Sequence, residues 1–178
     1  LLGKDETELN TETFEVEYPE EVVMEDAPGL FTMFCIGGTI FLSPSVSMVW
    51  SGNERNFQLT KEIPVISFYP SKKTYPDGYI GIEYSYIFKA EKSFLRTGYK
   101  HIIEIPVIEY ISPGIGGFSD LNGSNGISGE IALGLFKMSD VFTLYTRYRY
   151  NRELRGEGSK GFSEVSLGLY SSFFSLNF

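Results

Sequence analysis

Charged residues alternate with apolar ones inside several extended stretches of this sequence. In residues 79–89, Ile82 and Tyr84 fall on one side of an extended chain and Glu83 falls on the other. Such strict alternation predicts β-strands, because successive side chains of a strand point to opposite faces. The polar faces of the predicted strands carry four acids and four bases, which are Glu83, Glu104, Glu130, Glu164, Arg96, Lys100, Arg147 and Arg149. Equal numbers of opposite charges predict a network of ion pairs, because an unpaired buried charge is costly.

Other residue patterns with known chemistry are incomplete. Acyl hydrolysis requires a His paired with a Ser, but His101, the one histidine, is predicted to lie on an apolar face away from such a Ser. Residues 120–126 are rich in oxygen ligands, yet Ile131 stands where a calcium loop needs a bidentate Glu. Cys35, the single cysteine, has no partner for a disulfide or a metal site. We therefore predict no catalytic residue, no metal and no cofactor.

The elements that would position these charges are β-strands. Aromatic residues make up 16% of the 178 residues and Gly occurs 19 times, which favours extended structure with tight turns. The sequence contains no run of 18 apolar residues that would predict a membrane-spanning helix. Pro64 and Pro106 predict bulges or strand ends, because proline cannot donate to a ladder. We predict an antiparallel meander of eight strands, near residues 30–42, 45–51, 57–69, 79–89, 94–109, 127–136, 141–150 and 162–178.

The polar faces distinguish a membrane barrel from a soluble sandwich. They combine Gly, Ser and Ala with the eight charges, whereas the opposite faces are apolar and carry five tyrosines, Tyr84, Tyr86, Tyr99, Tyr148 and Tyr150, often near strand ends. Tyrosine at such positions suits a membrane interface. We predict an all-β, eight-stranded antiparallel up-and-down transmembrane β-barrel, with its apolar faces outward and an interior filled by ion pairs without an open pore. The alternative is a soluble β-sandwich with solvated ion pairs on its surface.

Acidity is concentrated in an N-terminal arm. Residues 1–29 hold ten acids and one base, whereas residues 30–178 hold 13 acids and 14 bases. We predict two regions, an acidic periplasmic arm over 1–29 and the barrel over 30–178. The arm is either solvated or a docking strand, since Phe14, Val16 and Tyr18 alternate with glutamates. Its charge repels nucleic acid, so we predict no nucleic-acid partner.

The predicted connections differ in length between the two ends of the barrel. Long segments at residues 70–78, 111–126 and 151–161 are expected outside the membrane, and short turns at 90–93 and 137–140 in the periplasm. This asymmetry is typical of outer-membrane barrels.

The end of the chain resembles the C-terminal targeting strand of Gram-negative outer-membrane proteins. That pattern has a final Phe preceded by apolar residues at alternating positions, here Phe178, Leu176, Phe174 and Tyr170. Val165 and Leu167 have the opposite phase, which predicts a bulge between residues 170 and 173. The meander is similar to small barrels of the OmpA and OmpX kind. The resemblance implies a bacterial outer-membrane location with periplasmic termini, and recognition by the barrel-assembly machinery.

Together these patterns predict a non-enzymatic integral outer-membrane barrel that acts as a structural or accessory subunit of a larger outer-membrane complex. The expected partners are outer-membrane lipid, the assembly machinery during biogenesis, and a protein in the outer membrane or periplasm. Two alternatives remain open at this point, a lipid-modifying enzyme or narrow transporter of the same membrane, and a soluble ligand-binding sandwich.

Overall fold

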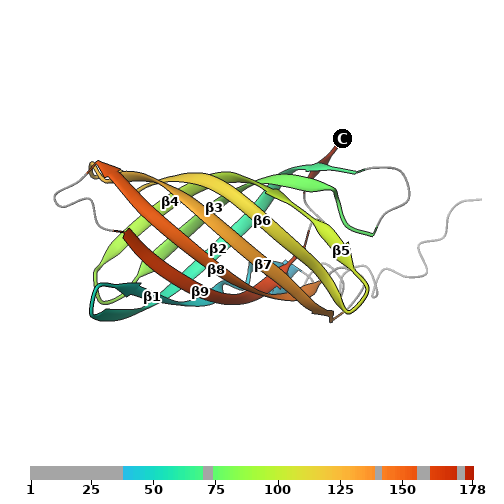
Figure 1. The fold of residues 1–178 in the computed structure, drawn as a ribbon, viewed down its shortest axis with the longest axis horizontal. Helices are drawn as coiled ribbons and strands as arrows, with labels where there is room; N and C mark the ends of the chain where they lie inside the picture. The colour runs from blue at the N-terminus through green and yellow to red at the C-terminus, as the bar shows by residue number, and fades with distance from the viewer. Residues whose placement is uncertain (1–37, 70–73, 139–141, 156–160, 172–174) are drawn as a thin grey trace, which may run out of the picture.

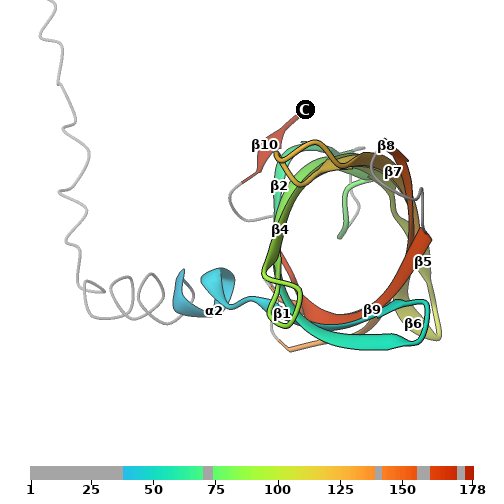
Figure 2. The same cartoon turned by 90° about the vertical axis from the view of Figure 1, so that its left-hand side faces the viewer.

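The chain forms a closed antiparallel β-barrel in the computed structural model (Figures 1 and 2). The structure describes residues 38–69, 74–138, 142–155, 161–171 and 175–178. Strands that are neighbours in the wall pair antiparallel, and β1 pairs with both β2 and β9, so the sheet closes on itself. The strands of the wall are β1 (Ser45–Ser51), β2 (Glu54–Phe68), β3 (Gly78–Ile87), β4 (Lys92–His101), β5 (Ile103–Ile105), β6 (Ile108–Ser119), β7 (Asn125–Lys137), β8 (Thr143–Arg155) and β9 (Gly161–Tyr170).

The wall has eight positions because β5 continues β4, and both pair with β6. This arrangement confirms the predicted eight-stranded up-and-down barrel. Two further elements lie outside the ring, the short helix α2 (Gly38–Leu42) and the two-residue strand β10 (Leu176–Asn177) (Figure 2). In the part of the chain that the structure describes, no helix is long and apolar enough to cross a membrane.

The connections divide the barrel into two ends. Strands β1, β3, β6 and β8 end, and β2, β4, β7 and β9 begin, at one end of the barrel, which we call the turn end. Strands β2, β5, β7 and β9 end, and β1, β3, β6 and β8 begin, at the other, which we call the terminal end.

Two predicted elements were wrong. Residues 38–42, the end of the predicted strand 30–42, form the helix α2, and residues 30–37 lie outside the described residues, as does the acidic arm. Conversely, most of the predicted loop 111–126 is strand β6, whose Pro and Gly residues resemble a loop in sequence. The number of strands is unchanged, but the segments that were predicted outside the membrane, 70–78, 111–126 and 151–161, do not share one end of the barrel. Residues 88–91 and 120–124 connect strands at the turn end, whereas residues 74–77 precede β3 at the terminal end, so the predicted asymmetry of loop lengths was also wrong.

The predicted last strand is divided in two. Strand β9 ends at Tyr170, and β10 then pairs in parallel with Ile66 and Ser67 of β2 outside the ring. The main chain of Phe178 accepts from Tyr69 N at 2.8 Å and donates to Ser67 O at 2.9 Å. The change of phase before the C-terminus therefore accompanies the exit of the chain from the wall.

Both prolines interrupt pairing as predicted. The β2–β3 register shifts between Pro64 and Ile66, and Pro106 lies in the turn between β5 and β6.

The outer face of the wall is apolar and the inner face is polar, which is the reverse of a soluble barrel. On β9, Val165 and Leu167 are 41% and 45% exposed, while the neighbouring Glu164 and Ser166 are 0% and 1% exposed. On β3, Ile82 is 47% exposed and Glu83 is buried. The apolar side chains therefore point outward and the charged ones inward, as the alternation in the sequence predicts.

Glycines bring strands β3, β4 and β6 together at one level. Gly98 faces Gly81 on one side and Gly116 on the other. A Cβ atom at position 98 would lie 2.5 Å from the carbonyl oxygen of Ile115 and 2.8 Å from Cα of Gly116. Because these are backbone atoms, the wall itself would have to move to accept a side chain.

We expect Gly98→Ala to lower the free energy of unfolding by about 1–3 kcal/mol, the usual cost of overpacking. Urea unfolding of refolded protein, followed by the fluorescence of Trp50, measures the change. Gly129→Ala is the matched control, because a Cβ atom there meets nothing within 4 Å. Equal stability of the two variants would contradict the close approach of β4 and β6.

Candidate functional site

The middle of the barrel contains a belt of eight charged side chains, which we call the charged belt. It consists of four acids and four bases, Glu62, Glu83, Glu130, Glu164, Arg96, Lys100, Arg147 and Arg149. They project inward from β2, β3, β4, β7, β8 and β9. Several face each other directly across neighbouring strands, such as Glu83 and Arg96, or Arg149 and Glu164.

Arg149 makes the densest set of contacts in the charged belt. Its Nη1 and Nη2 donate to the two oxygens of Glu83 at 2.5 and 2.7 Å. Its Nη1 also donates to Glu164 Oε1 at 2.6 Å, and its Nε to Glu130 Oε2 at 2.5 Å. One guanidinium thus joins carboxylates from three strands, in the forked geometry that makes such pairs strong.

The other bases extend the network. Arg147 Nη1 donates to Glu83 Oε2 at 2.7 Å and to Glu62 Oε2 at 2.9 Å. Lys100 Nζ lies 2.5 Å from Glu62 Oε2 and also pairs with Glu130. Arg96 reaches Glu83 at 3.3 Å and Glu164 at 3.4 Å. The eight charges therefore balance within the barrel.

Aromatic layers cover the charged belt on both sides. Toward the turn end, the rings of Phe94, Phe118 and Phe162 are 5.7 Å apart in each pair, and we call them the phenylalanine layer. Toward the terminal end lies a tyrosine layer, made of Tyr75, Tyr79, Tyr110, Tyr145 and Tyr170. Both layers are buried, so the belt has little contact with bulk water and its ion pairs are only weakly screened.

Tyr75 closes the tyrosine layer from the β2–β3 connection. Its ring meets Tyr110 edge-on, with centroids 5.1 Å apart. Its hydroxyl donates to Glu109 at 3.0 Å and lies 2.8 Å from Thr143 Oγ1. Burial raises the pKa of the Tyr75 hydroxyl to about 12. Tyr75 therefore remains neutral over the physiological range of pH.

The structure places seven of the eight sequence-predicted charges in the belt, but not Glu104. Glu104 is exposed on β5, beyond the tyrosine layer, where it accepts a hydrogen bond from Tyr75 N at 3.0 Å. Its strand phase is inward, yet β5 extends past the part of the barrel that encloses side chains.

Glu62 takes the place in the belt that was predicted for Glu104, and sequence reasoning missed it. The adjacent Lys61 and the bulge after Pro64 hide the alternation of β2. The signal that could have identified it is the series of polar residues at even positions, Asn56, Gln58, Thr60 and Glu62.

The residues of the predicted assembly signal are separated in the structure. Tyr170 is buried in the tyrosine layer, whereas Leu176 and Phe178 are 63% and 73% exposed on the outer segment. Phe174 lies outside the described residues.

The described residues offer little reactive chemistry. His101 is exposed, and its Nδ1 lies 3.4 Å from the hydroxyl of Tyr99 rather than near a serine. The Asp120 carboxylate accepts from the backbone N–H groups of Asn122 and Ser124 at 2.9 and 2.8 Å, so it stabilises its own turn. Over the described ranges, no group of three or more His, Cys, Asp or Glu residues could hold a metal ion.

The space left beside the charged belt is small. The cavity lined by Arg96, Gly98 and Arg149 measures about 20 Å³, which is room for about one water molecule. The belt and the aromatic layers can therefore hold the wall together and obstruct passage through the barrel.

We expect Arg149→Met to lower the free energy of unfolding by about 3–5 kcal/mol, because it leaves buried carboxylates without their partner. The matched control is Lys137→Met, since Lys137 lies 3.9 Å from Glu109 and both are about one-third exposed. An exposed pair of this kind contributes at most about 1 kcal/mol. Urea unfolding measures both variants, and a loss for Arg149→Met no larger than for the control would contradict a dry, coupled belt.

No protein-family model, no curated protein and no solved structure matches this chain. The assignment of a function therefore depends on the barrel's own residues, above all on its apolar outer face and its charged interior.

Proposed function

We propose that this chain is an integral β-barrel protein of a bacterial outer membrane, with periplasmic termini and a non-enzymatic role as a structural or accessory subunit of a larger complex. The observation that carries the proposal is the inversion of polarity across the wall. Val165 and Leu167 face outward, while Glu164 and Ser166, which alternate with them, are buried. Exposing an apolar wall to water is unfavourable, whereas hydrocarbon accepts it.

The height of the apolar face also suits a bilayer. On β2, Phe57 and Phe68 are outward-facing and 46% and 39% exposed. The eleven residue steps between them correspond to roughly 28 Å along the barrel axis, for a rise of about 3.3 Å per residue and a tilt of about 40°. Outer-membrane barrels have an apolar band about 25 Å tall.

Tyrosine hydroxyls on the outer face are satisfied locally. Tyr84 OH lies 2.9 Å from Ser93 Oγ, and Tyr148 OH lies 3.2 Å from Ser163 Oγ. A ring with a paired hydroxyl can occupy the boundary between hydrocarbon and head groups.

The filled interior favours a structural role over transport. The charged belt and the aromatic layers leave space for about one water molecule beside the belt. Elimination favours an accessory role, since among the described residues His101 contacts Tyr99 and not a serine. The acidic arm of residues 1–29 and the outer face offer surfaces for a protein partner.

We expect the protein to run faster unboiled than boiled on a gel in mild detergent, because folded barrels keep their closed sheet there. In planar bilayers it should give no steady ion conductance. The double variant Phe94→Ala/Phe118→Ala, which opens the phenylalanine layer and keeps all eight charges of the belt, shows what a leak through the barrel would look like. A steady conductance of the unaltered protein would contradict a closed barrel.

Purification of the full chain from native membranes in mild detergent tests the subunit role. We expect a discrete complex with at least one other outer-membrane or periplasmic protein. A barrel that purifies alone at every detergent concentration tried would count against the accessory role, and lipid modification lost on substitution of Arg147 or Glu130 would favour an enzyme.

A further inference from the structure

The barrel wall is incomplete on one side. Strand β1 begins at Ser45, which pairs with Thr60, whereas β2 continues to Phe68. On the other side of β1, Val46 pairs with Leu167, and β9 continues to Tyr170. Among the described residues, the side of β2 that faces β1 therefore has no paired strand between Thr60 and the contacts of β10 at Ile66–Ser67, whereas its other side pairs with β3. We call this interval, residues 61–65 of β2 and 168–170 of β9, the wall gap.

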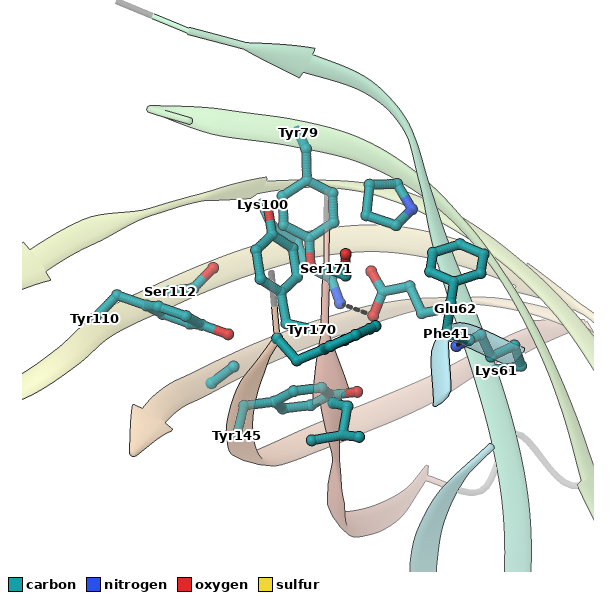
Figure 3. A pocket seen from close by; sticks show the side chains of 14 residues that line it. Phe41, Lys61, Glu62, Tyr79, Lys100, Tyr110, Ser112, Tyr145, Tyr170 and Ser171 are labelled. Carbon is teal, nitrogen blue, oxygen red and sulfur yellow. Dashed lines mark hydrogen bonds and ion pairs between the residues drawn. The ribbon is translucent and has the colours of Figure 1, made fainter. Parts of the chain in front are cut away.

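A cavity passes through the wall gap. Its lining includes side chains of the outer face, Lys61 and Leu169, and side chains of the interior, Glu62, Tyr79, Lys100 and Tyr110 (Figure 3). Because β1 does not extend to this level, the cavity lies between β2 and β9 in the described part of the wall. We call the interior part, bounded by the tyrosine layer, the tyrosine chamber.

Residues 38–44, which we call the strap, cover the wall gap from outside. The ammonium group of Lys61 donates to the carbonyl oxygens of Phe41 and, at 3.3 Å, of Ser43. It also lies 4.7 Å from the centroid of the Phe41 ring, which is part of the cavity lining. Lys61 thus holds the strap in place, with Phe41 across the opening.

The position of Lys61 is informative if the outer face lies in a membrane. Lys61 pairs across the strands with Tyr84, on the apolar outer face, four residues from Phe57. A lysine there is costly in hydrocarbon unless it has partners. The strap carbonyls are those partners, and Lys61 would lose them if the strap moved away. Lys61 therefore favours the closed position of the strap.

The chemistry of the tyrosine chamber suits an apolar chain with a polar end. Tyrosine ring faces, Ala132 and Leu169 provide apolar walls. Ser112, 2% exposed, also lines the cavity, and its hydroxyl has no hydrogen-bond partner among the described residues. A buried hydroxyl without a partner is costly, and an ester carbonyl would satisfy it. With the strap in place the cavity is only about 20 Å³, so a ligand enters only when Phe41 leaves.

We propose that the wall gap is a lateral port, closed by the strap, through which the acyl chain of a membrane lipid enters the tyrosine chamber from the bilayer. This inference rests on the membrane location given under the proposed function. It adds a lipid-binding site and the direction of access to it.

Thiol labelling in lipid vesicles tests the port. The reporter is Ala132→Cys, in a chain whose single native cysteine is removed by Cys35→Ser, because Ala132 lines the chamber and is 5% exposed. Two reagents compete for it, a pyrenyl maleimide that partitions into the bilayer and an anionic thiosulfonate that stays in water. The strap is released by Phe41→Ala or Lys61→Met.

We expect either release to accelerate labelling by the bilayer reagent on the order of tenfold. Lys61→Met removes the charged donor to the two strap carbonyls, and Phe41→Ala removes the ring that covers the opening and contacts Lys61. Labelling by the aqueous reagent should not change. Phe88→Ala, a truncation elsewhere on the outer face, should accelerate neither reagent. A thiol introduced by Ser128→Cys, four residues along the same strand and beyond the belt, should stay unreactive in every background.

Unchanged labelling by the bilayer reagent after release of the strap would overturn the port. Equal acceleration of both reagents would overturn it too, because the chamber would then open to water. Failure of the membrane location itself is distinguished beforehand, since the unaltered protein would not float with the vesicles.

Native mass spectrometry provides a test without a thiol in the chamber. After delipidation and incubation with a diacyl phospholipid, the strap variants should retain one lipid for each barrel, and Phe88→Ala should not gain it. Ala132→Phe, which fills the chamber, should abolish retention in the strap variants. Retention that survives Ala132→Phe would place the lipid elsewhere on the outer face and overturn the proposal.

Discussion

The rest of the structure depends on the balanced ion pairs of the charged belt. Four carboxylates and four basic groups from six strands meet inside the barrel, and Arg149 alone contacts three of the carboxylates. Charges of this density can be buried only if each has a partner, which sets the register of β8 against β7 and β9. Successive side chains of a strand point to opposite faces. Because the charged side chains point into the barrel, the apolar side chains that alternate with them point outward.

The aromatic layers and the belt form one interior. The phenylalanine layer and the tyrosine layer exclude water from either end, and this strengthens the ion pairs between them. Arg96 also links the charged belt to the phenylalanine layer, since its guanidinium lies 5.2 Å from the centroid of the Phe94 ring. At the wall gap a cavity lies between this interior and the outer face, and there Lys61 and the strap complete the wall.

Much of the barrel could be predicted from the sequence because alternation carries the signal. Strands β3, β7, β8 and β9 have strict period two, and their phases place Glu83, Glu130, Arg149 and Glu164 inside. Strand β6 lacked that signal, since its Pro and Gly residues serve a close approach to β4 and resemble a loop.

The exceptions in the candidate site have physical reasons as well. Strand phase gives the face of a residue but not its depth, and so Glu104 was assigned to the belt although it lies past the tyrosine layer. Glu62 was missed because the bulge after Pro64 interrupts its strand. The parallel pairing of β10 with β2 joins residues about a hundred positions apart, and no local pattern records such a contact.

The central claim is that the outer face of the barrel contacts hydrocarbon. Nitroxide labels at positions 82 and 165, on the outward faces of β3 and β9, test it most directly in lipid vesicles, with a label at position 121 in a turn as the aqueous reference. We predict that oxygen, which concentrates in hydrocarbon, relaxes the labels at 82 and 165 strongly, while a water-soluble nickel chelate reaches only the label at 121. Equal access of the nickel chelate to all three positions would contradict the account.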